Sequence, residues 1–372
     1  MAEDKRERER TIKMGIAFVS WLLNTIFIFA PAYLKSIPLS GTRIGILTST
    51  VYIFPAIFYP YAGHLCDVLS PKIVLIIGLI LFFVFSSLLG FLKSFSLLIF
   101  AYIAGSLGMA FINISIDTIF YRQEKSEKSF SGYIGSGGIG MGIGYIIAGF
   151  LTQNAGFPPF FYLLAGFSFI TSLLSLKFLK YETHLMVDEA NFRFWKDRRF
   201  ILLLLVNIFH GLHFGAETSA LAIFFKNGPG LNESETGIVL GLSIFFLSFC
   251  GLFTKRLSEM GIKGKKLYSM GLFLSGTGSI LMVFSKGFNS VLLFRFLHVA
   301  GDAFIFVGSR ELTSSIFGEE KIGRIWGGIR SGVALSAFIG AIVSGVLIQF
   351  VNSSAPFIVS GVSSIFAITF LP

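Results

Sequence analysis

Twelve long apolar stretches fill most of this 372-residue chain and constrain its fold more than any other feature. A helix needs roughly 20 largely apolar residues to cross a bilayer, at about 1.5 Å of rise per residue. The joins between the stretches are short and carry most of the charge. The sequence therefore predicts an all-α integral membrane protein with twelve transmembrane helices. The expected spans lie near residues 12–34, 44–63, 73–92, 96–120, 133–153, 157–178, 200–225, 236–253, 267–285, 289–312, 325–349 and 355–371.

The composition agrees with a membrane protein. Hydrophobic residues make up 54% of the chain and charged residues only 13%, whereas a soluble domain usually carries about 25% charged residues. The mean hydropathy is +0.78. These values exclude a soluble enzyme, so the question becomes what the helix bundle moves or does.

The 30 lysines and arginines are distributed unevenly between the two sides of the predicted bundle. Twenty-two fall on the side of the N-terminus, five on the other side and three within helices. Because lysine and arginine collect in cytoplasmic loops, we expect a multi-pass protein of the plasma or inner membrane with both termini in the cytoplasm. This topology also explains the net charge of +10, so lipids are the expected surroundings and no nucleic-acid partner is predicted.

The longest polar join, residues 179–199, divides the spans six and six. We expect an N-terminal six-helix bundle over 1–178, a cytoplasmic linker over 179–199 and a C-terminal six-helix bundle over 200–372. Two such bundles built from repeats are related by a pseudo-two-fold axis along the membrane normal.

Short sequence matches between the halves indicate internal repeats. The first two matches have an offset of 192 residues and the third has an offset of 196. The fifth span is also rich in glycine, which predicts close helix packing or a seam along which the halves rock. The matched segments are Gly45-Ile46 with Gly237-Ile238, Leu65-Cys66-Asp67 with Leu257-Ser258-Glu259, and Gly149-x-Leu151-x-Gln153 with Gly345-x-Leu347-x-Gln349.

The join between the second and third spans carries a motif. Residues 63–72 read GHLCDVLSPK, which resembles the glycine–leucine–aspartate–basic loop signature of the major facilitator superfamily. The residues that match the family pattern are Gly63, Leu65, Asp67 and Lys72. Three positions depart from it, where the family usually has a basic residue, a glycine and a basic residue: Val68, Ser70 and Pro71.

The resemblance covers the whole chain, with six plus six spans, a central linker and a degenerate second copy of the motif at 257–266. It implies the fold of that family, in which two bundles surround one central site. It also implies a secondary active transporter that moves a small-molecule substrate by alternating access.

The loop motif predicts a gate at the cytoplasmic ends of the helices. A carboxylate at Asp67 can face the positive N-terminal end of span eleven, which starts near Gly323. Asp117, at the inner end of span four, can approach Lys72. We expect Asp67, Lys72 and Asp117 to hold the cytoplasmic ends together when the cavity faces outward, and solvated loop charges are the alternative interpretation.

Spans seven and ten carry ionisable residues inside the membrane, where a charge is costly and by default indicates function. Those four or seven positions apart share one helical face. Counting about 1.5 Å per residue along two antiparallel helices, we expect pairing at three depths, with Glu217 level with Arg295. The six residues are His210, His213, Glu217, Arg295, His298 and Asp302.

This set of residues predicts proton coupling or substrate binding, and a packing or hydrogen-bonding role is the alternative. A metal site is conceivable, but His210 and His213 are three apart and lack the His-Glu-x-x-His spacing of zinc proteases. We therefore predict no metal, no cofactor and no catalytic residue.

Further polar residues are candidates for the substrate cavity. Asn24 lies in span one, and Asn113 lies in span four; the family resemblance implies that spans one, four, seven and ten line the cavity. Arg330 lies a turn or two into span eleven, where it can pair with an acid or bind an anionic group of a substrate.

The predicted function is a secondary active transporter, coupled to protons as in a symporter. The alternative is a proton-driven exporter of amphiphilic compounds, although the fifth span lacks the glycine–proline step common in such exporters. An intramembrane enzyme is disfavoured because no nucleophile or metal triad is evident. A channel is disfavoured because the polar residues cluster in two helices of one half.

Overall fold

The computed structural model describes residues 2–123, 127–179, 196–317 and 322–372, and in these ranges every regular element is a helix. Each expected span coincides with one helix except the first, which is divided in two, and the last, which continues from α13 into a 3₁₀ turn. The elements are α1 (Ala2–Leu23), α2 (Ile26–Ser36), α3 (Gly41–Val68), α4 (Pro71–Leu89), α5 (Phe95–Gln123), α6 (Glu127–Ala155), α7 (Phe157–Phe178), α8 (Arg198–Asn227), α9 (Glu233–Glu259), α10 (Gly264–Met282), α11 (Phe288–Phe317), α12 (Ile322–Phe350), α13 (Ala355–Ala367) and the 3₁₀ turn η3 (Ile368–Phe370).

Ten helical spans in the described residues are long and apolar enough to cross a membrane, with α1 and α2 counted as one span, Glu9–Ser36. The two remaining expected spans are α10, with 19 residues, and the shorter apolar helix Ala355–Phe370. Large apolar side chains cover the outside, for example Phe100, Leu252 and Phe350, which are 70%, 73% and 73% exposed. Such a surface requires lipid contact, because soluble proteins rarely expose so much apolar area.

The first span is interrupted where its polar residues lie. The backbone N–H groups of Asn24 and Thr25 bond to carbonyls three residues back, at Trp21 and Leu22, instead of four. The Thr25 hydroxyl also donates to the Leu22 carbonyl at 2.7 Å. Short polar side chains compete for the backbone in this way and tighten or bend a helix, so α1 ends and α2 begins here.

Side-chain caps fix the starts of several helices. Asn232 and Glu235 form a reciprocal capping box at the start of α9, and Asp197 caps α8 through the backbone N–H of Arg199 at 2.8 Å. The Arg199 guanidinium beside Asp197 holds the pKa of that carboxyl below its usual value. Ser70 caps α4 with φ of 144°, a region that favours glycine, at the position where the resembled motif usually has glycine.

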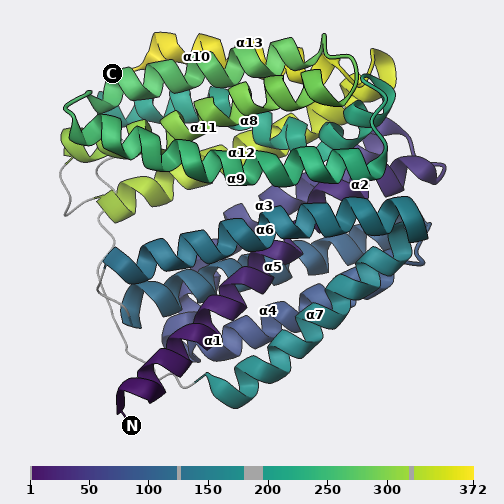
Figure 1. Ribbon diagram of the computed structural model, residues 1–372, viewed down its shortest axis with the longest axis vertical. Coiled ribbons are helices and arrows are strands. Elements are labelled where there is room, and N and C mark those ends of the chain that lie inside the picture. The colour runs from purple at the N-terminus through teal and green to yellow at the C-terminus, as the bar shows by residue number, and fades with distance from the viewer. Residues whose placement is uncertain (1, 124–126, 180–195, 318–321) are drawn as a thin grey trace.

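The helices before the linker and those after it form two groups (Figure 1). In the first group α4 packs on α5 and α7, and α1 on α6; in the second α10 packs on α11, and α8 on α12 and α13. The largest contacts between the groups are those of α3 with α12 and of α6 with α9, and α2 and α3 also contact α8. The division into rigid bundles stays a prediction, since residues 180–195 of the linker lie outside the described part of the chain.

Both termini lie on one side of the molecule, at the left of Figure 1. We call this side the terminal face and the other side the opposite face. On the opposite face the start of α3 meets the end of α12, and the start of α9 meets the end of α6. Towards the terminal face, Asp117 of α5 and Arg330 of α12 are 3.9 Å apart and remain 42% and 71% exposed. The halves are thus closed together on the opposite face and more open on the terminal face.

Candidate functional site

Ionisable residues of α8 and α11 meet inside the C-terminal half. Nη1 of Arg295 forms an ion pair with Oε1 of Glu217, at the shared depth that counting along the two helices gives. The side chains of Arg295 and Glu217 are only 6% and 17% exposed. A guanidinium buried this far is stable only beside a carboxylate, because an unpaired buried charge is costly.

His298 lies between the two carboxylates of this cluster. Its Nε2 is 3.1 Å from Oε1 of Glu217 and 3.4 Å from Oδ2 of Asp302. Its Nδ1 is 2.8 Å from the carbonyl oxygen of Ser275, which can only accept, so Nδ1 carries a proton. Ionised carboxylates also only accept. A proton therefore lies between Nε2 and the carboxylates, either on His298 or on one of the two acids.

Asp302 is held in place by a helix outside the predicted cavity. The hydroxyl of Ser275, on α10, donates to Oδ1 of Asp302 at 2.7 Å. Ser275 and Asp302 are both buried. One oxygen of the carboxylate is thereby fixed, and the other faces the imidazole of His298.

Two more histidines extend the cluster along α8. Nδ1 of His213 donates to the carbonyl of His210 at 2.8 Å, which leaves its buried Nε2 as an acceptor without a partner in the described residues. Nδ1 of His210 is 3.0 Å from the hydroxyl of Ser364 on α13. The rings of His210 and His213 lie 4.2 Å apart, and those of His213 and His298 lie 5.4 Å apart. The lone pair on the buried Nε2 of His213 is therefore able to accept a hydrogen bond or a proton.

The N-terminal half faces the cluster with two tyrosines. The hydroxyl of Tyr52, on α3, donates to the carbonyl of Phe214 at 2.8 Å and also bonds to Thr218, beside Glu217. Tyr145, on α6, is close enough to interact electrostatically with Glu217 and Arg295. The cluster thus lies against the boundary between the halves, where a movement of one half changes its surroundings.

Within the described part of the chain, two sets of three side chains could hold a metal ion, with the ligand atoms of each set within 4.8 Å of one another. In the set that contains Glu217, this carboxylate already faces Arg295 and His298, two groups that carry or share positive charge. Imidazole and carboxylate are ligands that a transition metal accepts, and the same atoms bind protons. The sets are His210 with His213 and Asp302, and His213 with Glu217 and His298.

The predicted cavity residues lie in α5, in α12 and in the break between α1 and α2, and they do not join the cluster. Nδ2 of Asn24, in the break between α1 and α2, donates to the carbonyl of Ser20 at 3.2 Å. Asn113, on α5, lies close to Tyr59 on α3. Arg330 is 3.9 Å from Asp117 and is the most exposed of the three candidates. Of these three it is therefore the one that presents a charge towards the terminal face.

Two residues of the predicted gate, Lys72 and Asp117, contact α7 and α12, respectively. Lys72 donates from Nζ to the carbonyl of Leu176 at 2.7 Å. Gly63 and Leu65 lie in the last turns of α3, where nothing approaches within 4 Å of a Cβ placed on Gly63. The side chain of Asp67 lies outside the described part of the chain.

Four residues of the site had no signal in the sequence. Serine and tyrosine are common in apolar helices, and none of the four stands at a helical spacing that links it to the charged residues. Their role follows only from the packing of α3, α6, α10 and α13 around α8 and α11. The four are Tyr52, Tyr145, Ser275 and Ser364.

The fold and the buried cluster define a polytopic membrane transporter. A sequence profile described as Major Facilitator Superfamily matches residues 14–258 and 203–372. The chain belongs to this family, which confirms the transporter class and the twelve-helix fold predicted from the sequence.

The chain is similar to known transporters in sequence and in structure. It is 26% identical to the quinolone resistance protein NorA of Staphylococcus aureus (strain MSSA476) over 351 residues, which is 88% of this chain and 86% of that protein. The crystal structure of a mutant of the nucleoside transporter NupG superposes with a TM-score of 0.85 at 15% identity, covering 98% of this chain and 99% of that one. A bacterial homologue of the lysosomal transporter Spinster, inward-facing and occupied, gives 0.73 at 14% identity, covering 98% and 94%. The structures establish the shared fold.

Proposed function

We propose that this secondary transporter couples a small solute to protons through the cluster of Glu217, Arg295, His298 and Asp302. The observation that carries the proposal is the position of His298 Nε2, 3.1 Å from a carboxylate oxygen of Glu217 and 3.4 Å from one of Asp302. Burial disfavours a charged carboxyl, while a nearby cation favours it. Tyr52 of the N-terminal half bonds to Thr218, which is beside Glu217. Movement of the halves therefore changes whether burial or the nearby cation has the stronger influence, and proton binding then depends on conformation.

Protons explain the arrangement better than a resident metal ion. The positive charges of Arg295 and a protonated His298 balance the two carboxylates without a further cation. A divalent ion between His213, Glu217 and His298 would have to displace one of these partners. The proposed activity is accordingly transport without a catalytic step.

A proton-driven exporter of amphiphilic compounds is the second candidate. The similarity to a quinolone resistance protein over 88% of this chain favours it. The exposed guanidinium of Arg330 favours a substrate with an anionic group, which a quinolone-like molecule would supply. Proteoliposomes loaded with radiolabelled candidates and given a pH gradient of either sign distinguish the two: a symporter accumulates solute with the proton flow and an exporter against it.

We propose that the terminal face is cytoplasmic and that the protein lies in the plasma membrane of its cell. The 22 lysines and arginines on that side support this orientation. Single cysteines at Glu259 and Asn154, in a background with Cys66 and Cys250 replaced by alanine, are expected to be protected and labelled, respectively, by an impermeant maleimide applied to whole cells. Labelling of both positions, or of Glu259 alone, contradicts the orientation.

We also propose that Asp67, Lys72 and Asp117 close the terminal face when the opposite face opens. In the present state Asp117 pairs with Arg330 and Lys72 bonds to Leu176, so both are available for exchange. Asp67→Asn is expected to lower the transport rate at least about tenfold, a loss of roughly 1.4 kcal/mol, with normal amounts of folded protein in the membrane. Glu259→Gln, an exposed carboxylate on the same face, is the control. A wild-type transport rate in Asp67→Asn contradicts the gate.

A further inference from the structure

The halves meet on the opposite face at two contacts that share one design. Oε1 of Gln349, at the end of α12, accepts from the backbone N–H of Thr42 at 3.1 Å and from its hydroxyl at 2.7 Å. Oε1 of Gln153, at the end of α6, accepts from the backbone N–H of Glu233 at 3.1 Å. The first N–H groups of a helix have no partner inside it. Each glutamine therefore caps a helix of the other half.

Glycines bring the backbones together at both contacts. A Cβ placed on Gly345 would lie 2.6 Å from the carbonyl oxygen of Gly41 and 2.7 Å from Cα of Gly45. A Cβ placed on Gly237 would lie 2.8 Å from Cα of Gly149. Any side chain at these positions would push the helices apart, so only glycine lets the glutamines reach their partners.

The two contacts are copies related by the internal repeats. The 192-residue offset carries Gly45 onto Gly237, and the 196-residue offset carries Gln153 onto Gln349. The early motif of each half therefore meets the late motif of the other half: Gly45 lies against Gly345, and Gly237 lies against Gly149. The sequence matches late in each half, which the transport site does not use, have a structural role here.

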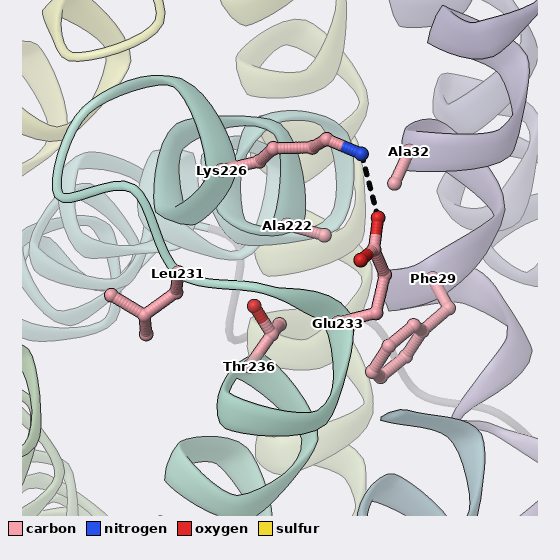
Figure 2. A pocket seen from close by; sticks show the side chains of 7 residues that line it. All are labelled: Phe29, Ala32, Ala222, Lys226, Leu231, Glu233 and Thr236. Carbon is pink, nitrogen blue, oxygen red and sulfur yellow. Dashed lines mark hydrogen bonds and ion pairs between the residues drawn. The ribbon is translucent and has the colours of Figure 1, made fainter. Parts of the chain in front are cut away.

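The second contact continues into a small pocket between the halves, which Figure 2 shows. Glu233 and Lys226 form an ion pair of 2.6 Å within the C-terminal half, and Phe29 and Ala32 of α2 line the other wall. Ala222 and Lys226 both lie on α8, and Ala222 is 5% exposed. Opening of the opposite face would expose this buried position.

We propose that Gln153 and Gln349 are two matched latches that set how much of the time the opposite face is closed, and that the face opens when both amides release their helix. This role rests on the proposed alternating access but not on proton coupling. Both glutamines are exposed, so water can replace each bond. A neutral hydrogen bond of this kind changes an equilibrium by roughly two- to tenfold, which suits a contact that must form and break in every cycle.

The test is the rate at which a cysteine at Ala222 reacts with a water-soluble maleimide, in purified full-length protein in nanodiscs with Cys66 and Cys250 replaced by alanine. Gln349→Leu and Gln153→Leu are each expected to raise the rate about two- to tenfold, and the double variant by about the product of the two. Gln349 joins α12 to α3, whereas Ala222 is on α8 and lines the pocket beside the contact of Gln153. An increase caused by Gln349→Leu as well as by Gln153→Leu reports release of both contacts of the opposite face.

Two variants separate a latch from a merely structural glutamine. Gln349→Glu keeps the accepting oxygen and adds negative charge at the start of α3, which favours the contact, so it is expected to leave the rate unchanged or lower. Asn154→Leu removes a neighbouring amide that bonds only within α6 in the described structure, and it is expected to match wild type. Should a leucine variant fail to fold, asparagine, whose side chain is one methylene shorter, replaces it.

Rates in the leucine variants equal to that of Asn154→Leu overturn the proposal, as does an increase in Gln349→Glu equal to that in Gln349→Leu. Maleimide reactivity requires neither a substrate nor a pH gradient. Failure of the latches and failure of proton coupling are therefore seen in separate experiments.

Discussion

Replacing Glu217 by glutamine is expected to lower the stability of the protein by about 3–5 kcal/mol. The variant leaves the guanidinium of Arg295, which is 6% exposed, without the carboxylate that balances its charge. The measurement is the midpoint of thermal unfolding of the purified protein in detergent, monitored as the loss of the helical circular dichroism signal. A large downward shift is expected, together with poor yield.

The double variant Glu217→Gln with Arg295→Met is the control for this prediction. It removes both charges, and replacing a buried ion pair by apolar groups of similar size is often neutral or stabilising. Most of the lost stability is expected to return in the double variant. Uphill transport driven by a pH gradient is expected to be absent in both variants, because both lack the Glu217 carboxylate. Equal stability of wild type and Glu217→Gln would show that the guanidinium does not depend on Glu217.

Replacing Asp302 by asparagine is expected to abolish uphill transport driven by a pH gradient while exchange at equal concentrations continues. Asparagine keeps an oxygen that accepts from Ser275, and His298 can stay neutral when one carboxylate is gone, so the fold is retained. Exchange requires no net proton release and survives for that reason. Accumulation of labelled substrate in proteoliposomes, with Glu259→Gln as the control, measures both. Normal pH-driven accumulation in Asp302→Asn contradicts a coupling role for this residue.

Most of the fold could be predicted from the sequence because a membrane leaves few choices. Backbone groups in lipid must bond within their own segment, so each long apolar stretch becomes a helix. The helices extend past the predicted ends, as in α9, which continues to Glu259, because their last turns leave the apolar layer. The break at Asn24 in the first span was not predicted, since one polar residue does not show which carbonyl it will contact.

The candidate site was only partly predictable, for a related reason. The Glu217–Arg295 pair follows from helical spacing and equal rise in two antiparallel helices. The bonds that orient the histidines come from Ser275 and Ser364, on helices whose rotation is set by packing and not by local pattern. The approach of Asp117 to Lys72 stays a prediction for the other conformation, because Asp117 pairs with Arg330 in this one.

The most direct test of the central claim, that proton binding at the cluster depends on which face is open, is the pH dependence of cysteine reactivity at Ala222. By linkage, protons that bind the two conformations differently must shift the balance between them. In nanodiscs between about pH 5 and 8, and after correction for the thiolate fraction of a free thiol, the rate in wild type is expected to change several-fold. In Asp302→Asn it is expected to change little. The same pH dependence in both proteins would contradict the account.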